Sequence, residues 1–209
     1  MSGSSSVKIN HLICVLTDCF GEIPIWPGNA GEVMIGAIFT QQTWWENVER
    51  TLVNLKKKRL SSLDTIFPAE MQEIEDAVRC TGFYRVRARR LKSLAMHVME
   101  MYGGTTGMAN IPTGQLGQGL LTVSGIGEEI ADTILCYGLS RTGFVIDTYT
   151  EKMTQCMGVM DGALKSIFEE VLQDDNHSHR QTHAHIVEYG IEFCGKKRCS
   201  ECILLSLNA

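Results

Sequence analysis

Apolar residues recur along most of the chain at the three- and four-residue spacing of an amphipathic helix. One stretch illustrates the spacing, with apolar side chains at Val33, Ile35, Ile38, Trp45, Val48, Leu52 and Leu55. The pattern predicts helical segments over residues 7–20, 33–39 continuing to 55, 71–78, 86–101, 116–123, 128–139, 149–157, 163–172 and 182–193. Runs that alternate apolar and polar residues between tight hairpin turns are missing, so the expected fold class is all-α.

Polar and glycine-containing stretches separate these segments. Pro24, Pro27, Gly28 and Gly31 mark a loop after the first helix. Residues 176–185 hold four of the six histidines, and they predict a polar connector that leads into the last helix, with metal binding as the alternative.

The length and composition indicate a globular protein with one domain or two small ones. A hydrophobic content of 44% in 209 residues is enough to bury a core. The formal net charge of -5 does not favour nucleic-acid binding by the chain as a whole. Such binding would rest on local basic runs, at 56–59, 85–92 and 196–198, which otherwise predict solvated faces. No apolar run is long enough to span a membrane, and no membrane partner is expected.

The cysteines and the first apolar run bear on the cellular compartment. Cys14, Cys80 and Cys136 lie inside apolar patterns, which suits reduced thiols better than a disulfide framework. The run 12–20 carries Asp18 and has no strongly basic flank, so it predicts a helix and not a signal peptide. A cytoplasmic protein is therefore expected.

A glycine-punctuated turn, formed by Gly125, Ile126 and Gly127, joins two predicted short helices. Such a turn and the helix start that follows it leave backbone N–H groups without intrahelical partners, and the helix dipole there favours an anion. The turn is therefore a candidate phosphate-binding site. A tight corner between helices is the alternative reading.

Three separate segments carry a resemblance to a known family. They are Leu121, Val123, Gly125, Ile126, Gly127 and Ala131 followed by Asp147; the stretch EVMIGAIFTQQTWWENVERTLVNL; and the stretch GFYRVRARRLKSLA. In this order they resemble the helix-hairpin-helix DNA glycosylases of the endonuclease III superfamily, over roughly residues 31–152. The resemblance implies double-stranded DNA with a damaged base as the partner, and a nucleoid-associated monomer is expected.

The resemblance also implies two helical domains with DNA in the cleft between them. Residues 23–135 would form a six-helix barrel domain that includes the hairpin at about 116–135. Residues 1–22 with 136–209 would form the second domain, and Asp147 would lie at the mouth of the cleft.

Two adjacent carboxylates, Glu128 and Glu129, follow the hairpin. In family members that also cut the DNA backbone, a lysine at the position of Glu129 forms a Schiff base with the sugar. A carboxylate cannot form that imine, so the resemblance implies a glycosylase without AP lyase activity that hydrolyses the N-glycosidic bond with water. Glu128 is read as a first-turn acid that complements the helix dipole.

Asp147 is the expected catalytic residue. Cleavage of the N-glycosidic bond builds positive charge on the deoxyribose, and a fixed carboxylate stabilises that charge and orients or deprotonates the attacking water. Spacing alone equally predicts that Asp147 caps the helix that begins near Thr148. The two roles are compatible.

The base pocket is expected to contain Trp26, Pro27, Trp45 and Glu129. These residues are similar to those of the endonuclease III-like 3-methyladenine DNA glycosylases, in which two aromatic side chains hold the flipped base. Electron-rich indole faces attract the positively charged base through cation–π contact. Ordinary core packing is the alternative for both tryptophans.

The turn that holds Gln41 and Gln42 is expected to bind DNA near the vacated base. Either glutamine could hydrogen-bond to the orphan base, and a plain helix-turn role is the alternative. Gln41 is preferred by its position in the motif.

Many relatives end with four cysteines that hold an iron–sulfur cluster. Here Cys199 and Cys202 keep the expected spacing, Cys194 is displaced, and the other two positions fall at Glu192 and Asn208. Three thiolates do not complete the four-ligand site, so no cofactor and no metal are expected. A zinc site that borrows His183 or His185 is the weaker alternative.

The leading functional hypothesis is hydrolysis of alkylated purines such as 3-methyladenine from DNA. A glycosylase of the same fold that acts on oxidised or mismatched bases is one alternative. A catalytically silent helix-hairpin-helix module that only binds DNA is the other.

Overall fold

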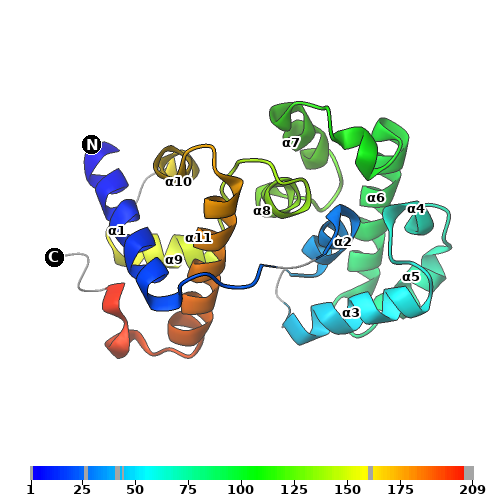
Figure 1. The fold of residues 1–209 in the computed structure, drawn as a ribbon. Coiled ribbons are helices and arrows are strands. Elements are labelled where there is room, and N and C mark those ends of the chain that lie inside the picture. The colour runs from blue at the N-terminus through cyan, green and yellow to red at the C-terminus, as the bar shows by residue number, and fades with distance from the viewer. Residues whose placement is uncertain (1, 26–27, 41–42, 44, 160–161, 205–209) are drawn as a thin grey trace. The chain divides into compact units, whose positions relative to one another are not determined.

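A computed structural model describes residues 2–25, 28–40, 43, 45–159 and 162–204. Within these ranges the regular elements are all helical and none is a strand, which confirms the expected all-α class (Figure 1). The chain divides into two compact units, one formed by Gly28–Ser140 and the other by Met1–Pro27 together with Arg141–Ala209. We name them the central unit and the terminal unit.

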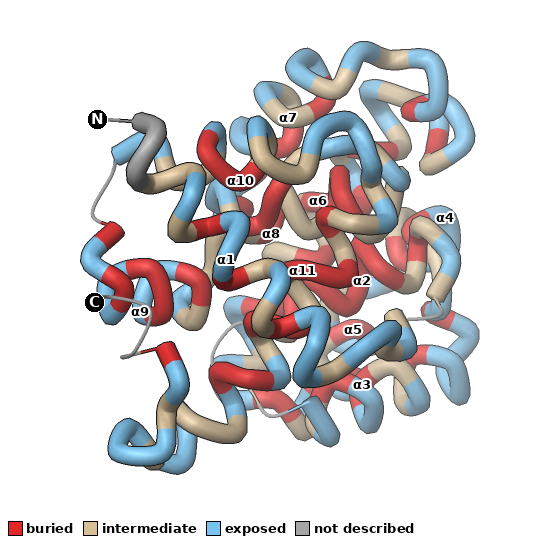
Figure 2. The backbone as a smooth tube through the Cα atoms, turned by 60° about the vertical axis from the view of Figure 1, so that its left-hand side comes forward, coloured by how far each residue is buried: buried red, intermediate tan, exposed pale blue. Residues whose placement is uncertain are grey.

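The central unit is built around one buried helix. Its elements are α2 (Ala30–Thr40), α3 (Trp45–Lys57), α4 (Leu63–Ile66), α5 (Met71–Val78), α6 (Tyr84–Tyr102), η1 (Thr105–Met108), α7 (Thr113–Leu121), α8 (Glu128–Thr133) and η2 (Ile134–Gly138). Every residue of α2 from Val33 to Phe39 is buried, and the helix packs against α3, α6, α8 and η2 (Figure 2). A helix that is apolar on all sides is stable only inside such a shell.

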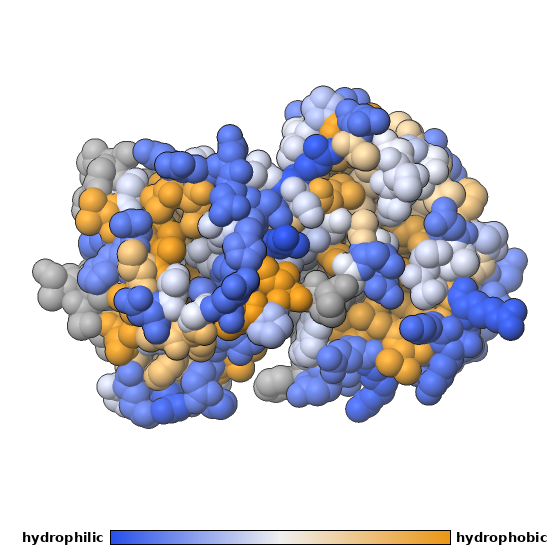
Figure 3. Space-filling view, viewed as in Figure 1, coloured by the Kyte–Doolittle hydropathy of each residue, from blue (hydrophilic) through white to orange (hydrophobic). Residues whose placement is uncertain are grey.

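The outer helices of the central unit are amphipathic. Val48 and Leu55 of α3 are fully buried. The opposite side of the helix is hydrophilic at the edge of the unit (Figure 3) and exposes Glu46, Glu49, Arg50, Lys56 and Lys57. This division is the one that the three- and four-residue spacing predicts.

The terminal unit packs four helices around aromatic and aliphatic side chains. Its elements are α1 (Ser2–Phe20), α9 (Thr148–Cys156), α10 (Leu164–Leu172), α11 (Asn176–Tyr189), η3 (Gly190–Gly195) and η4 (Cys199–Glu201). Helix α11 packs against α1, α9 and α10. Phe144 and Phe168, both fully buried, stack with ring centroids 4.0 Å apart.

Two details of the predicted helices differ from the structure. The periodic stretch 33–55 is two helices, because α2 ends at Thr40 and α3 begins at Trp45. The polar connector expected at 176–185 is wrong, since these residues form most of α11. Asp175 caps that helix by accepting hydrogen bonds from the N–H groups of His177 and Ser178.

The units also begin and end later than the sequence suggests, at 27/28 and 140/141 instead of 22/23 and 135/136. The second shift has a physical reason in the π-helical turn η2 (Ile134–Gly138), which continues α8 and packs on α2. Its residues therefore belong to the core of the central unit.

The basic run 85–92 was expected to form a solvated face, but two of its cationic side chains have structural roles. The Arg87 guanidinium is buried and donates to Phe39 O at 2.7 Å and Thr43 Oγ1 at 2.5 Å. Lys92 Nζ donates to three carbonyl oxygens at the end of α4, those of Ile66, Phe67 and Ala69. Both side chains satisfy backbone groups that the short helices leave open.

No helix in the part of the chain that the structure describes has the length and apolarity needed to cross a bilayer.

Candidate functional site

The central unit contains the expected hairpin, formed by α7, a tight turn and α8. Gly125 has φ of +86°, a left-handed conformation that favours glycine. Ile126 points into the core, and its N–H donates to Val123 O at 3.0 Å. Gly127 is extended and is the N-cap of α8. The buried isoleucine anchors the turn while both flanking glycines remain exposed, as a turn that presents its backbone to a ligand requires.

A cation packs directly against this turn. An ideal Cβ placed on Gly125 would lie 2.5 Å from Arg90 Nε and 2.6 Å from Arg90 Cγ. Arg90 is half-buried on α6. The absence of a side chain at Gly125 therefore leaves room for the Arg90 side chain, which lies against the turn. A cation next to such a turn is suited to a phosphate.

The two carboxylates after the turn differ in their surroundings. Both Glu128 and Glu129 occupy the first turn of α8, where negative charge complements the helix dipole. Glu128 is exposed, in agreement with the dipole role read from sequence, whereas Glu129 is half-buried. The environment of Glu129 is thus the more restricted of the two.

Asp147 in the terminal unit is held rigidly by one of its two carboxylate oxygens. Oδ1 accepts hydrogen bonds from Thr150 N and from Thr150 Oγ1, each at 2.7 Å, so Asp147 is the N-cap of α9. Its side chain is only 15% exposed. The capping role that spacing predicts is confirmed, and Oδ2 takes no part in it.

A histidine that sequence reasoning did not connect with Asp147 lies beside this second oxygen. His183 Nε2 on α11 is 3.9 Å from Asp147 Oδ2, and the histidine side chain is 13% exposed. Burial lowers the pKa of His183 below its ordinary value, and the Asp147 carboxylate acts in the opposite direction. The site therefore places an imidazole of lowered pKa beside a carboxyl group that is fixed in a helix cap.

The expected base-pocket and wedge residues are only partly within the described ranges. Trp45 is the first residue of α3 and 44% exposed, so the alternative reading of Trp45 as a core aromatic is wrong. Trp26, Pro27, Gln41 and Gln42 lie outside the described residues. Their expected roles stay predictions.

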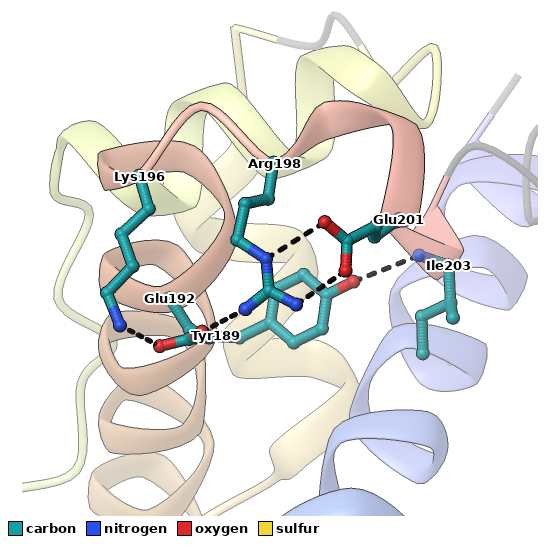
Figure 4. A network of polar contacts seen from close by, with 6 residues as sticks. All are labelled: Tyr189, Glu192, Lys196, Arg198, Glu201 and Ile203. Carbon is teal, nitrogen blue, oxygen red and sulfur yellow. Dashed lines mark hydrogen bonds and ion pairs between the residues drawn. The ribbon is translucent and has the colours of Figure 1, made fainter.

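The C-terminal tail is organised by polar contacts around one arginine (Figure 4). Arg198 forms ion pairs with Glu192 and with Glu201, and Glu192 also pairs with Lys196. Tyr189 OH donates to Cys202 Sγ at 3.4 Å and accepts from Ile203 N at 3.0 Å. These contacts connect α11 and η3 with η4 and the residues that follow it, and all but the one from Ile203 N run between side chains.

The donor set of this tail does not fit a four-cysteine cluster. Glu192, at the position of the family's first cysteine, is committed to two cations, and Cys202 is a hydrogen-bond partner of Tyr189. Among the described residues, no three side chains of His, Cys, Asp or Glu converge as metal ligands. The expectation that Cys194, Cys199 and Cys202 hold no cluster stays a prediction, and the iron content of the purified protein tests it.

The predicted site residues that the structure describes fall in both units, with Trp45 at the start of α3 in the central unit. Gly125, Ile126, Gly127 and Glu129 share one hairpin of the central unit, and Asp147 stands in the terminal unit beside His183. A glycine turn between two short helices, together with a carboxylate that caps a later helix and an all-helical fold over the described residues, defines a helix-hairpin-helix protein of the glycosylase fold.

The chain belongs to the HhH-GPD superfamily of base excision DNA repair proteins, whose family model matches residues 35–190. A Methanocaldococcus jannaschii protein named as a DNA repair glycosylase is 39% identical over 197 residues, which cover 90% of each chain. A crystal structure of the H. pylori 3-methyladenine DNA glycosylase bound to 1,N6-ethenoadenine has 26% identity and a TM-score of 0.77, covering 90% of this chain and 97% of that one.

A structure of a non-covalent endonuclease III–DNA complex has 19% identity and a TM-score of 0.78, covering 97% of this chain and 94% of that chain. At this identity the likeness concerns the fold alone. The family match spans the hairpin, Asp147 and His183.

Proposed function

We propose that this protein is a monofunctional DNA glycosylase that removes alkylated purines such as 3-methyladenine from double-stranded DNA and acts as a monomer. Family membership supports the glycosylase class. The single observation that carries the reaction type is Asp147, a mostly buried carboxylate with one oxygen fixed in a helix cap and the other outside the cap.

The proposed hydrolysis uses Asp147 as its essential charge. As the N-glycosidic bond breaks, its electron pair leaves with the base and positive charge develops on the sugar. Water adds to the sugar carbon and gives up a proton to the Asp147 carboxylate. A base that carries positive charge is already an activated leaving group, so little general-acid help is required.

The hairpin is proposed to bind the DNA backbone. Gly125 and Gly127 are exposed residues whose N–H groups are proposed to bind a phosphate, and the neighbouring Arg90 adds positive charge. Glu129 stands where a Schiff-base lysine stands in the lyases that the sequence resembles, and it supports hydrolysis without strand cleavage.

The substrate assignment rests on the aromatic residues and on one relative. Trp45 exposes 44% of its surface at the start of α3, as an indole that stacks on a flipped base requires. Trp26 and Pro27 are proposed as the second wall. The H. pylori neighbour, a 3-methyladenine DNA glycosylase, supports the same substrate class.

The deciding experiment incubates the protein with methylated DNA and with duplexes that carry uracil, thymine glycol or a mismatch, and then identifies the released bases. We expect free 3-methyladenine and no covalent adduct after borohydride reduction. Release of an oxidised or mismatched base alone would overturn the substrate assignment. DNA binding without release of any base would indicate a silent module, and a borohydride-trapped adduct would indicate a lyase.

A further inference from the structure

A buried cation from α6 holds the turn between α2 and α3. Helix α2 ends at Thr40 and α3 begins at Trp45. The Arg87 guanidinium donates to Phe39 O at 2.7 Å, on the α2 side of the turn, and to Thr43 Oγ1 at 2.5 Å, on the α3 side. One side chain therefore connects the end of the first helix with the start of the second.

Trp45 depends on this turn more than the rest of α3 does. Val48 and Leu55 are fully buried and fix the body of the helix in the core. Trp45 lies three residues before Val48 and so on the same face, but as the first residue of the helix it keeps 44% of its surface exposed. The position of such a ring follows the backbone at the helix start, and Thr43 lies two residues before it.

Burying a cation at this place is unfavourable unless the cation is hydrogen-bonded. Arg87 is only 6% exposed, and burial lowers the pKa of its guanidinium from the ordinary value, with Arg90 acting in the same direction. An apolar side chain of similar length would avoid the desolvation of a charge. Arginine offers instead several N–H donors in a rigid plane, so it holds two acceptors at a set separation. The presence of arginine therefore points to a geometric requirement.

We infer that Arg87 is a positioning residue for base capture and sets the position of Trp45. The inference rests on the proposed function, in which the Trp45 indole stacks on the flipped, positively charged base. Arg87 fixes the separation between the end of α2 and Thr43, and through Thr43 it fixes the first turn of α3. A displaced first turn moves the indole away from the base, and a misplaced contact slows the reaction.

The test compares Arg87→Met with the matched control Lys92→Met in the full-length protein. Methionine is unbranched and fills a similar space without charge or donor groups. Lys92 lies on the same helix and also satisfies backbone carbonyl groups, those of Ile66, Phe67 and Ala69 at the end of α4. Both variants should therefore melt at a lower temperature than the wild type, and only Arg87→Met should affect Trp45.

Fluorine NMR of protein labelled with fluorotryptophan reports on Trp45 without DNA. The chain has three tryptophans, and the variant Trp45→Phe identifies the Trp45 resonance. We expect Arg87→Met to shift this resonance and Lys92→Met to leave it in place. Thr43→Val removes only the hydroxyl acceptor and should also shift it, which keeps the test available if Arg87→Met does not fold. A Trp45 resonance that stays in place when the Arg87–Thr43 contact is removed would overturn the inference.

Single-turnover excision then shows whether Arg87 acts through Trp45. We expect Arg87→Met to excise about tenfold more slowly than the wild type, and Lys92→Met to excise at the wild-type rate below its melting temperature. In a Trp45→Ala background, Arg87→Met should cause no further loss, because the residue that it positions is gone.

Two results of the excision assay have different meanings. If the double variant Arg87→Met, Trp45→Ala loses the product of the two single losses, Arg87 acts independently of Trp45 and the inference alone is overturned. A wild-type protein that releases no base from any duplex overturns the proposed function and the role of Arg87 in base capture with it. The fluorine measurement still decides in that case whether Arg87 positions Trp45.

Discussion

Asp147 caps a helix and is proposed to act in catalysis, and two substitutions at this position separate the two roles. Its Oδ1 caps α9 through two hydrogen bonds from Thr150, and its charge is proposed to drive hydrolysis. Asparagine keeps a side-chain oxygen at the cap and removes the charge, whereas alanine removes both. We therefore expect Asp147→Asn to lose activity with little loss of stability, and Asp147→Ala to lose both.

The expected stability difference follows from the two hydrogen bonds. Loss of the cap costs about 1 kcal/mol. Thr150 is fully buried, so its hydroxyl would lose a buried partner in Asp147→Ala at a cost of about 1 kcal/mol or more. Their sum of about 2 kcal/mol corresponds to a fall of about 4–8 °C in melting temperature for a chain of this length. For Asp147→Asn we expect less than half of that fall.

The expected activity loss is much larger. Removal of a positioned charge or a general base costs about 10²- to 10⁴-fold in rate, and both variants should show it. The assay is single-turnover release of 3-methyladenine from methylated DNA, with thermal unfolding of the same preparations as the control. An Asp147→Asn protein that excises within threefold of the wild-type rate, or that melts as early as Asp147→Ala, would refute the division of roles between Oδ1 and Oδ2.

Four further results are expected. Gly125→Ala forces a side chain into the left-handed region and against Arg90, so it should lose about 1–2 kcal/mol of stability and bind duplex DNA more weakly. Gly114→Ala is the control and should show neither effect, because an added Cβ there meets nothing. Trp45→Ala should excise at least about tenfold more slowly with little change in unfolding temperature, and a stability loss typical of a core aromatic would contradict its exposure. Purified protein should contain no stoichiometric iron, and a brown sample would disprove this. Pairing with Lys196 and Arg198 lowers the pKa of Glu192, so its stabilising contribution is present above the ordinary value of 4.5 and is lost as pH falls below it. Hydrogen exchange in residues 192–204 should accelerate in that window, and the double variant Lys196→Gln, Arg198→Gln should remove the effect.

The positions of the helices could be predicted because most of them bury an apolar stripe. The segment 71–78 coincides with α5, and 163–172 differs from α10 by one residue. The four-residue helix α4 was not predicted because it is shorter than two turns and shows no apolar periodicity. Its start is defined by the capping box of Ser62 and Thr65. The hairpin could be placed because glycine spacing specifies a backbone conformation directly, and Gly125 adopts the left-handed conformation that such a turn requires.

Helix α11 shows why polar sequence alone misleads. Its first ten residues contain few apolar side chains, yet His179, Gln181, Thr182 and His185 are all buried. Gln181 accepts a hydrogen bond from Ile23 N and donates one to Ile23 O, so both polar groups of its side chain have partners although the residue is buried. Apolar periodicity detects helix faces that pack against other apolar side chains. It does not detect a polar face that is buried because its side chains hydrogen-bond to backbone groups far away in the sequence. The expected connector was wrong for this reason.

The proximity of His183 to Asp147 could not be predicted from the sequence either. Asp147 is the N-cap of α9 and His183 lies in the middle of α11, and their proximity depends on the packing of those two helices against each other. Sequence spacing predicted that Asp147 caps a helix, and the family resemblance implied a catalytic role that is compatible with capping. In the structure capping engages Oδ1 alone, and Oδ2 lies on the side of His183. A carboxylate that caps a helix is thereby held more rigidly than one on a loop, and rigidity is what a transition-state charge requires.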